Sequence, residues 1–279
     1  MFFCRKSPTI KQMKILMGKD RIMRKTLEAA ARCGGDMILA ADHIGATEKD
    51  GRRNLVTQYD VQVQGLLRTR LLEAYPEAHF IGEEGEAMKG DALHGLAFIV
   101  DPIDGTANFV RGYRASAVSI AAVRDGEVTC GVVYDPYSDT LFAAEKGKGA
   151  RQNGIPIHVS ENGLADSIVC FGTASYYPET FGRTFRLARA LFDLTMDMRR
   201  SGSAALDLCY VAAGRADLMF EARLCPWDHA AAGLIVTEAG GCVSRLSGAP
   251  VSLAGKCSVL VGAPRAWQEF FDKGLDRIK

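Results

Sequence analysis

Two aspartates, Asp101 and Asp104, lie three residues apart in the segment Asp-Pro-Ile-Asp-Gly-Thr-Ala-Asn at residues 101–108. Carboxylate and carbonyl oxygens suit a hard cation such as Mg²⁺ better than they suit zinc. The pair therefore indicates a magnesium site. The alternative is a strand that ends in an Asp-Gly turn with both carboxylates in water, because short motifs also match by chance.

Acidic residues end a predicted strand or begin a predicted helix at three further places. They are Glu83 with Glu84, Glu221, and Asp228. An aspartate at a helix N-terminus has a sufficient structural role as a cap, so Asp228 alone is a weak signal. Four such places in one chain nevertheless favour a shared acidic site.

Asp60 and Lys49 each have a structural alternative to a role in such a site. Asp60 can cap the helix that is predicted to follow it toward Pro76. Lys49 lies in the polar, turn-rich segment 47–54, predicted to be a loop, where a charged side chain is usually solvated. The glycine- and lysine-rich residues 146–149 lack the spacing of a phosphate-binding loop and are predicted to form a hairpin.

The elements that must position these residues follow from hydrophobic periodicity. The apolar run 96–100 predicts a fully buried strand, and Pro102 keeps Asp101 extended at its end. Open α/β sheets bind ligands at the carboxyl ends of their strands. A helix is predicted from Ile22, and strand-like runs at 117–123, 129–134 and 140–145 predict an antiparallel meander.

Strands and helices alternate in the second half of the chain. We expect strands at 167–171, 195–199, 218–221 and 258–261, and helices at 179–194, 204–213, 226–238 and 265–271. The fold class is therefore α/β (α+β), a two-lobed, layered αβαβα sandwich with a largely antiparallel sheet followed by a mixed sheet. The expected divisions are a basic, poorly ordered extension at 1–21, an N-terminal lobe at 22–153 and a C-terminal lobe at 154–279.

Composition restricts the class of protein. The chain has 279 residues, 48% hydrophobic and 24% charged, with a net charge of +1. This balance gives no electrostatic case for nucleic acid or an anionic membrane, and no apolar run is long enough to span a bilayer. Eight scattered cysteines without a CxxC pair are typical of reduced thiols, so we expect a cytoplasmic protein.

The motifs, taken together, resemble those of the inositol monophosphatases, within the superfamily of lithium-sensitive, magnesium-dependent phosphatases. The resemblance extends from about Met23 to the C-terminus and also includes Leu55-Val56-Thr57 with Asp60 and the segment 202–207. Its main motifs are Gly82-Glu83-Glu84, residues 101–108, Trp227-Asp228-His229-Ala230-Ala231-Ala232 and Thr237-Glu238-Ala239-Gly240-Gly241.

The resemblance implies a site with two or three Mg²⁺ ions per chain. The implied metal ligands are Glu83, Asp101, the carbonyl of Ile103, Asp104 and Asp228. Asp101 would bridge two ions, as a two-metal phosphatase site requires. Glu83 and Thr106 would orient and deprotonate the attacking water, with Asp60 supporting Thr106. Asp101 is also expected to be a catalytic residue, in addition to its role as a metal ligand.

The resemblance also implies how substrate is held. Backbone N–H groups of Gly105 and Thr106 would bind the phosphate, and Lys49 would lie near the metals. The polyol side of the pocket would contain Gly202, Ser203, Ala204, Glu221 and Asp228. His229 stands where the family usually has an apolar residue and is expected to face away, and Ala107 replaces a usual threonine or lysine, which leaves substrate preference open.

The function implied is a phosphomonoesterase acting on a phosphorylated polyol, with myo-inositol monophosphate favoured, as a homodimer without nucleic-acid or membrane partners. Fructose-1,6-bisphosphatase or 3'-phosphoadenosine 5'-phosphate phosphatase activity are alternatives within the superfamily. A catalytically idle regulatory binding protein is a rival of another class. The intact set Glu83, Asp101, Asp104, Thr106 and Asp228 argues against it.

Overall fold

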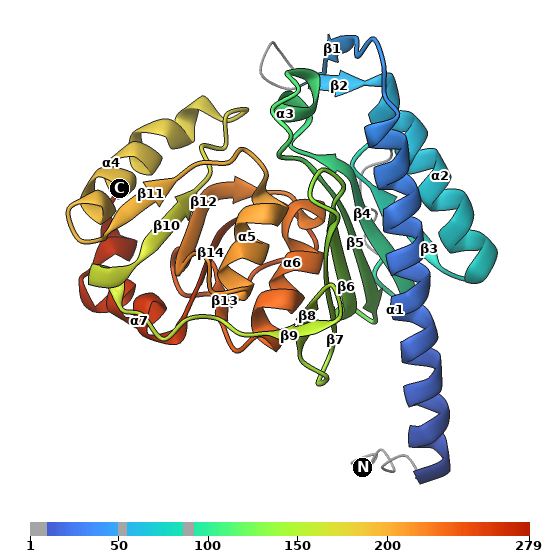
Figure 1. The fold of residues 1–279 in the computed structure, drawn as a ribbon. Coiled ribbons are helices and arrows are strands. Elements are labelled where there is room, and N and C mark those ends of the chain that lie inside the picture. Colours follow the sequence, from blue (N-terminus) through green and yellow to red (C-terminus); the bar gives the residue numbers. More distant parts are fainter. Residues whose placement is uncertain (1–9, 50–54, 86–91) are drawn as a thin grey trace.

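The strand that ends in Asp101 and Asp104 lies inside the largest sheet of the protein. The computed structural model describes residues 10–49, 55–85 and 92–279, and it describes side chains from Ile22 onward. This strand, β4 (Leu96–Asp104), is buried along its whole length. Figure 1 shows its sheet between two helical layers.

The seven-stranded sheet has the order β3-β4-β5-β6-β7-β8-β9. β3 pairs with β4 in parallel and all later neighbours are antiparallel, as the meander pattern predicted. The bounds of these strands besides β4 are β3 His79–Gly82, β5 Ala117–Arg124, β6 Glu127–Asp135, β7 Thr140–Glu145, β8 Ala150–Gln152 and β9 Ile155–Ile157. The seven-stranded sheet therefore extends to Ile157 in β9, a few residues beyond the boundary between the two lobes that the sequence suggested after residue 153.

The five-stranded sheet is mixed and has the order β11-β10-β12-β14-β13. β10 is parallel to β11 and β12, whereas β14 is antiparallel to β12 and β13. The strands are β10 Ile168–Phe171, β11 Asp197–Arg199, β12 Leu218–Leu224, β13 Cys242–Ser244 and β14 Cys257–Gly262. A largely antiparallel sheet followed by a mixed one is therefore confirmed.

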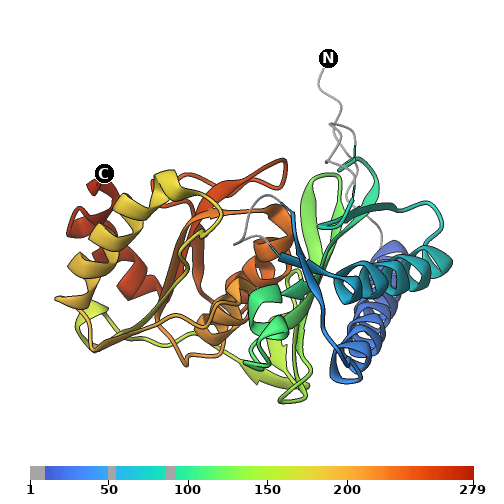
Figure 2. The ribbon, with the colours of Figure 1, turned by 90° about the horizontal axis from the view of Figure 1, so that it is seen from above.

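Three helical layers cover these two sheets (Figures 1 and 2). One outer layer packs on the seven-stranded sheet, the middle layer lies between the sheets, and the other outer layer packs on the five-stranded sheet. The layer outside the seven-stranded sheet consists of α1 (Ile10–Leu39) and α2 (Gln58–Ala74). The middle layer consists of α5 (Ala204–Ala212) and α6 (Pro226–Glu238), and the layer outside the five-stranded sheet of α4 (Phe181–Phe192) and α7 (Pro264–Asp272). One apolar cluster fills both faces of the middle layer, and one further cluster lies beneath each outer layer. The αβαβα layering is confirmed.

Short elements complete the chain. A two-stranded sheet pairs β1 with β2, and α3 (Thr106–Val110) follows β4. The remaining bounds are β1 Ala46–Glu48, β2 Leu55–Thr57, and the 3₁₀ turns η1 Leu164–Asp166, η2 Pro178–Thr180 and η3 Leu275–Arg277.

The middle layer touches the seven-stranded sheet closely at Gly131 in β6. A Cβ built on Gly131 would lie 2.5 Å from the carbonyl oxygen of Ala231 and 3.0 Å from its Cα. Such separations are shorter than normal packing distances, so only glycine lets α6 rest on β6 with the two backbones in contact.

Three local predictions need correction. α1 begins at Ile10 and not at Ile22, because the residues before Ile22 include strong helix formers and no sharp stop. Residues 47–48 of the expected loop belong to β1, where they pair with β2; residues 50–54 lie outside the described ranges. The N-cap of α2 is Thr57, and Asp60 completes its capping box as the third helical residue.

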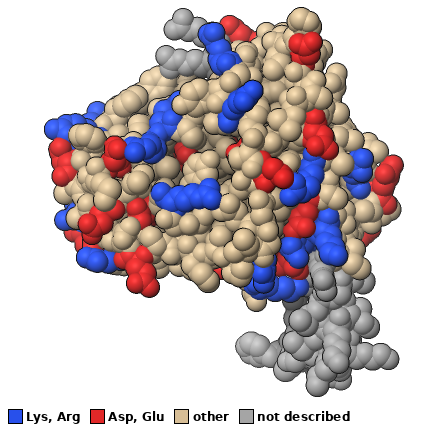
Figure 3. All heavy atoms as spheres, viewed as in Figure 1, with Lys and Arg blue, Asp and Glu red and all other residues tan. Residues whose placement is uncertain are grey.

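Charged residues of both signs are interspersed over the face shown in Figure 3. None of the described helices is long and apolar enough to cross a membrane. In the described chain the cysteines are free.

Candidate active site

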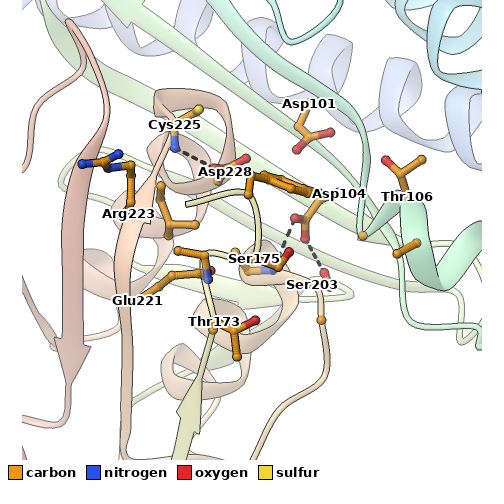
Figure 4. Close-up of a pocket in the computed structure, with 18 of the residues that line it drawn as sticks. Asp101, Asp104, Thr106, Thr173, Ser175, Ser203, Glu221, Arg223, Cys225 and Asp228 are labelled. Atoms are coloured by element: carbon orange, nitrogen blue, oxygen red, sulfur yellow. Dashed lines mark hydrogen bonds between the residues drawn. The ribbon is translucent and has the colours of Figure 1, made fainter. Parts of the chain in front are cut away.

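Three carboxylates from two distant parts of the chain converge at the carboxyl end of β4. Asp101 and Asp104 come from β4 and Asp228 from the first turn of α6. One oxygen of each lies within 4.8 Å of the others, and Figure 4 shows the three side chains around one pocket. The pairing of β4 with β5 is irregular between Asp101 and Asp104, so their spacing departs from that of a regular strand.

Asp104 is held by the start of α5. It accepts hydrogen bonds from the backbone N–H of Ala205 at 2.9 Å and of Ala204 at 3.3 Å, and from the hydroxyl of Ser203. Ser203 is the N-cap of α5. Burial raises the pKa of Asp104 to about 6, although these hydrogen bonds act in the opposite direction.

Asp228 is fixed by the start of α6. Its carboxylate accepts a hydrogen bond from the backbone N–H of Cys225 at 2.6 Å. Burial, followed by the charges of Glu83 and Asp104, raises the pKa of Asp228 well above its usual range. Burial and neighbouring carboxylates likewise raise the pKa of Asp101.

This donor set fits divalent magnesium. The carboxylates around the pocket repel one another and lose water by burial, and a cation of high charge removes both penalties. The donors are all oxygen, which suits Mg²⁺ and not a thiolate-preferring metal. Ile103 is buried and lines the same pocket, so its backbone carbonyl can supply a further oxygen ligand.

Glu83 and Lys49 form an ion pair at the edge of the cluster. Lys49 Nζ lies 3.0 Å from Glu83 Oε1 and also contacts Glu84. Burial raises the pKa of Glu83, and the opposing charge of Lys49 only partly offsets this. Lys49 is therefore not the solvated loop residue that the alternative interpretation expected.

Thr106 links the cluster to α2. Its hydroxyl lies 3.1 Å from Asp60 Oδ1 and 3.1 Å from the carbonyl oxygen of Ile103. The other oxygen of Asp60 accepts hydrogen bonds from Thr57, at 2.7 Å from its backbone nitrogen and 2.6 Å from its hydroxyl. Asp60 thus takes part in capping α2 and also contacts a candidate site residue.

Gly105 joins β4 to α3 in a conformation that favours glycine. Its φ is +88°, and an added Cβ would lie 2.9 Å from the carbonyl oxygen of Ala115. The first residue of α3, Thr106, and Gly105 both line the pocket. Free N–H groups at a helix start are suited to bind a phosphate.

The far end of the pocket contains Glu221 and the segment 172–177. Glu221 accepts a hydrogen bond from the backbone N–H of Ala174 at 2.7 Å, and burial raises the pKa of Glu221 to about 8. The cavity has a volume of about 310 Å³ and is also lined by Gly202, Ser203 and Ala204. Every residue that the resemblance assigned to the site lines it, except Asp60, which lies directly behind Thr106.

Of the two residues that flank Asp228 in α6, Trp227 borders the pocket, whereas His229 faces away from it as expected. Trp227 is half-buried, packs against the central apolar cluster and borders the pocket. His229 is buried with Nε2 4.0 Å from the sulfur of Cys257, away from the pocket, and burial lowers the pKa of His229 to about 4.

Sequence reasoning missed several pocket residues. Asp207 is buried at the pocket wall, and burial raises its pKa to about 7. Its place in the segment 202–207 was a signal that could have identified it. The aromatic and basic lining residues Tyr176, Tyr177, Arg200, Arg223 and Lys256 belong to no motif, so no sequence signal marked them.

Comparison with known proteins extends over nearly the whole chain. The pattern that defines the inositol monophosphatase family matches residues 20–278. The chain is 33% identical to an inositol-1-monophosphatase of Bacillus subtilis, over 93% of this chain and 97% of the relative. It is 38% identical to the Nus factor SuhB of Vibrio cholerae, over 78% of this chain and 83% of the relative.

Solved structures of similar proteins have the same architecture. An inositol monophosphatase of Thermotoga maritima aligns with a TM-score of 0.80 and 32% identity, over 93% of this chain and 96% of that chain. The suppressor protein SuhB of Bartonella henselae aligns with a TM-score of 0.82 and 32% identity, over 92% of this chain and 98% of that chain. With the acidic pocket at the end of β4, these matches show that the chain belongs to the inositol monophosphatase family.

Proposed function

We propose that this protein is a Mg²⁺-dependent phosphomonoesterase that releases phosphate from a phosphorylated polyol, with myo-inositol monophosphate as the favoured substrate. The convergence of Asp101, Asp104 and Asp228 beside the helix start at Thr106 is the observation that carries the proposal. Membership of the family supports phosphatase chemistry.

The proposed metal ligands are the acidic side chains at the end of β4 and their neighbours. Glu83, Asp101, the carbonyl of Ile103, Asp104 and Asp228 would hold two or three Mg²⁺ ions, which when bound supply positive charge to the phosphoryl oxygens and lower the pKa of the attacking water.

Thr106 and Glu83 orient the water in this proposal. When the Thr106 hydroxyl donates its hydrogen to Asp60, its lone pairs are left to accept a hydrogen bond from water. The Glu83 carboxylate can take up the proton, and Lys49 beside it favours the ionised form that does so. Backbone N–H groups of Gly105 and Thr106 bind the phosphate.

The polyol end of the pocket would consist of Gly202, Ser203, Ala204 and Glu221, with Asp228 between the two ends. A buried carboxyl such as Glu221 can accept hydrogen bonds from hydroxyl groups. Glu221→Gln should therefore weaken hydrolysis of inositol phosphate more than hydrolysis of an aryl phosphate. Equal losses on both substrates would remove Glu221 from the substrate role.

A panel of phosphomonoesters assayed with and without Mg²⁺ tests the function. Inositol 1-phosphate, fructose 1,6-bisphosphate, 3'-phosphoadenosine 5'-phosphate and an aryl phosphate distinguish the favoured substrate from the alternatives within the superfamily. We expect release that requires Mg²⁺ and is inhibited by millimolar lithium. If no phosphate is released from any member, the phosphatase proposal is wrong.

A role as a Nus factor is a second candidate, supported by the 37% identity to the Nus factor SuhB of Escherichia coli over 78% of this chain. The same panel separates it from the first: a chain with an intact acidic cluster and no turnover would favour a non-catalytic role. The lobes at 22–153 and 154–279, a homodimer without nucleic-acid or membrane partners, and a cytoplasmic location remain proposals. Sedimentation of the purified protein would test the dimer.

A further inference from the structure

Asn108, in the middle of α3, belongs to the motif at 101–108 but has no part in the proposed reaction. Its side chain is half-buried, and its amide nitrogen has two hydrogens to donate. That nitrogen lies 2.7 Å from the carbonyl oxygen of Ala115 and 3.0 Å from the carbonyl oxygen of Ser201. The amide therefore uses both of its hydrogens on backbone oxygens.

The two accepting carbonyls belong to segments attached to different sheets. Ala115 lies just before β5 in the seven-stranded sheet, whereas Ser201 lies between β11 of the five-stranded sheet and α5. Asn108 and Ser201 are 93 residues apart in the sequence. The Asn108 side chain is thus a bridge between distant parts of the chain.

Glycines leave no spare room around this bridge. A Cβ built on Gly202 would lie 3.1 Å from Nδ2 and 3.2 Å from Oδ1 of Asn108. A Cβ built on Gly105 would lie 3.2 Å from the carbonyl oxygen of Gly202. These separations are tighter than ordinary packing contacts, so the Asn108 amide and the backbones of Gly105 and Gly202 touch one another.

The two glycines stand at the two ends of the proposed substrate site. Gly105 and Thr106, here called the phosphate turn, are proposed to bind the scissile phosphate. Residues 202–204, here called the polyol segment, are proposed to bind the hydroxyl groups. Both line the same pocket, so the Asn108 bridge fixes the distance between its two binding ends.

Asp104 also joins the polyol segment to β4, but in a different way. It accepts hydrogen bonds from Ser203 and Ala204, and Figure 4 marks the contact with Ser203. A metal ion bound by Asp104 would share the same carboxylate oxygens. The bridge through Asn108 uses no proposed metal ligand, so it holds the polyol segment whether or not metal is bound.

We propose that Asn108 is a positioning residue that holds the polyol segment at a fixed distance from the phosphate turn and thereby favours rigid, cyclic polyol phosphates. The inference rests on the proposed function and specifies how its substrate class is selected. The hydroxyl groups of a ring lie at fixed distances from its phosphate, so a site with two fixed ends binds such a ligand with little loss of freedom. A phosphate ester without a polyol gains nothing from this spacing.

The bridge requires an amide at this position. Aspartate has nearly the same shape, but its carboxylate has no hydrogen to donate and would face the carbonyl oxygens of Ala115 and Ser201. Asn108→Asp should therefore break the bridge with little change in volume, whereas Asn108→Ala removes the amide altogether.

The ratio of the KM for inositol 1-phosphate to the KM for 4-nitrophenyl phosphate tests the proposal, because only inositol can use the polyol segment. Asn108→Asp and Asn108→Ala should each raise this ratio by about fivefold or more, which is the effect of losing one hydrogen bond. The Mg²⁺ concentration for half-maximal rate should stay as in the unchanged protein. An unchanged ratio, or a change confined to the Mg²⁺ requirement, would overturn the proposal.

Asn153→Ala is the matched control. The Asn153 side chain also makes two hydrogen bonds to backbone, accepting from Leu141 N–H at 2.8 Å and donating to the carbonyl of Asp139 at 3.0 Å, in a hairpin outside the pocket. This variant should lower Tm and leave the KM ratio unchanged. An equal rise of the ratio in Asn153→Ala would show that general loss of stability is the cause, and would refute the positioning role.

Ser201→Ala tests the bridge from its other end. The Ser201 hydroxyl donates to the carbonyl of Ser203 at 3.1 Å and accepts from its N–H at 3.0 Å, so it shapes the loop that presents the Ser201 carbonyl to Asn108. This variant should raise the same ratio by about twofold or more. If the Asn108 variants do not fold, an unchanged ratio in Ser201→Ala overturns the proposal. Absence of Mg²⁺-dependent release from either substrate by the unchanged protein would instead refute the proposed function.

Discussion

Thr106 and Asp60, which are 46 residues apart in the sequence, are joined by a contact of 3.1 Å between the hydroxyl of Thr106 and Oδ1 of Asp60. The contact connects the start of α3, where the backbone N–H groups of Gly105 and Thr106 are proposed to bind phosphate, to the first turn of α2. Asp60 is completely buried, so no solvent competes for this hydrogen bond. The direction in which the threonine hydroxyl points is thus set by a residue outside the pocket.

Asp60→Asn should lower kcat by ~10²-fold or more, within the range typical for loss of a proton-transfer group. The amide is the same size but is a weaker acceptor, so the Thr106 hydroxyl would turn toward Ile103. Steady-state kinetics at saturating Mg²⁺ measures the effect, and circular dichroism checks the fold. A kcat within twofold of the unchanged protein would exclude the positioning role.

Asp101→Asn should abolish Mg²⁺-dependent phosphate release, because it removes a charge and a carboxylate oxygen from the cluster. The metal-free variant should be at least as stable as the unchanged protein, since burial and neighbouring carboxylates disfavour the charged form of Asp101. Asp166→Asn, at an exposed position in η1, is the matched control and should keep full activity. Normal turnover by Asp101→Asn would contradict its assignment as a metal ligand.

The stability of the metal-free protein should fall as pH rises. Burial raises the pKa of Asp104 to about 6, of Asp207 to about 7 and of Glu221 to about 8. These groups therefore hold protons in the folded chain that the unfolded chain releases from about pH 4 upward. Their stabilising effect is complete below about pH 4 and is lost as pH passes through these raised pKa values.

Thermal unfolding in EDTA at about pH 5.5 and about pH 8.5 checks this trend, and each ~1 kcal/mol lost should lower Tm by ~2–4 °C. Added Mg²⁺ should raise Tm more at the higher pH, because metal binds the deprotonated carboxylates. Asp207→Asn should raise Tm in EDTA at the higher pH. An equal or higher Tm of the unchanged protein at about pH 8.5 would show that these carboxyl groups do not control stability.

Gly105→Ala should reduce kcat/KM by ~10²-fold, because misplacing a bound group by about 1 Å has an effect of this size. The added methyl group would meet the carbonyl of Ala115, so α3 and its N–H groups must shift. Gly126→Ala is a close control, since Gly126 has φ +81° with open space around its Cβ. Both variants should lose some stability from backbone strain. Equal catalytic losses in the two would mean that strain, and not the close contact, is responsible.

The acidic ends of strands and helices could be predicted from the sequence because they depend on local signals. A buried run followed by Asp101, and a helix start at Asp228, are each visible within a few residues. The layer order followed from the same patterns together with the family resemblance. The actual start of α1 and the N-cap at Thr57 were not predicted, because several residues near each helix end satisfy the same propensities.

The basic end of the pocket could not be predicted for a different reason. Tyr177 meets Arg223 and Lys256 only because the segment after β10, the end of β12 and the start of β14 lie side by side in the five-stranded sheet. Contacts between a cation and a ring leave no periodic pattern in the sequence. Asp207 was also overlooked, because an aspartate in an apolar helix usually indicates an exposed position.

Gly131 never reaches the pocket, yet it sets how far apart the ligands from the two halves of the chain can be. Its missing side chain determines the height at which α6 sits above β6, and α6 carries Asp228 while β4, two strands from β6 in the same sheet, carries Asp101 and Asp104. A single methyl group at this buried position would move Asp228 away from Asp101 and Asp104. Such a variant should lose Mg²⁺-dependent activity, although the altered residue does not line the pocket.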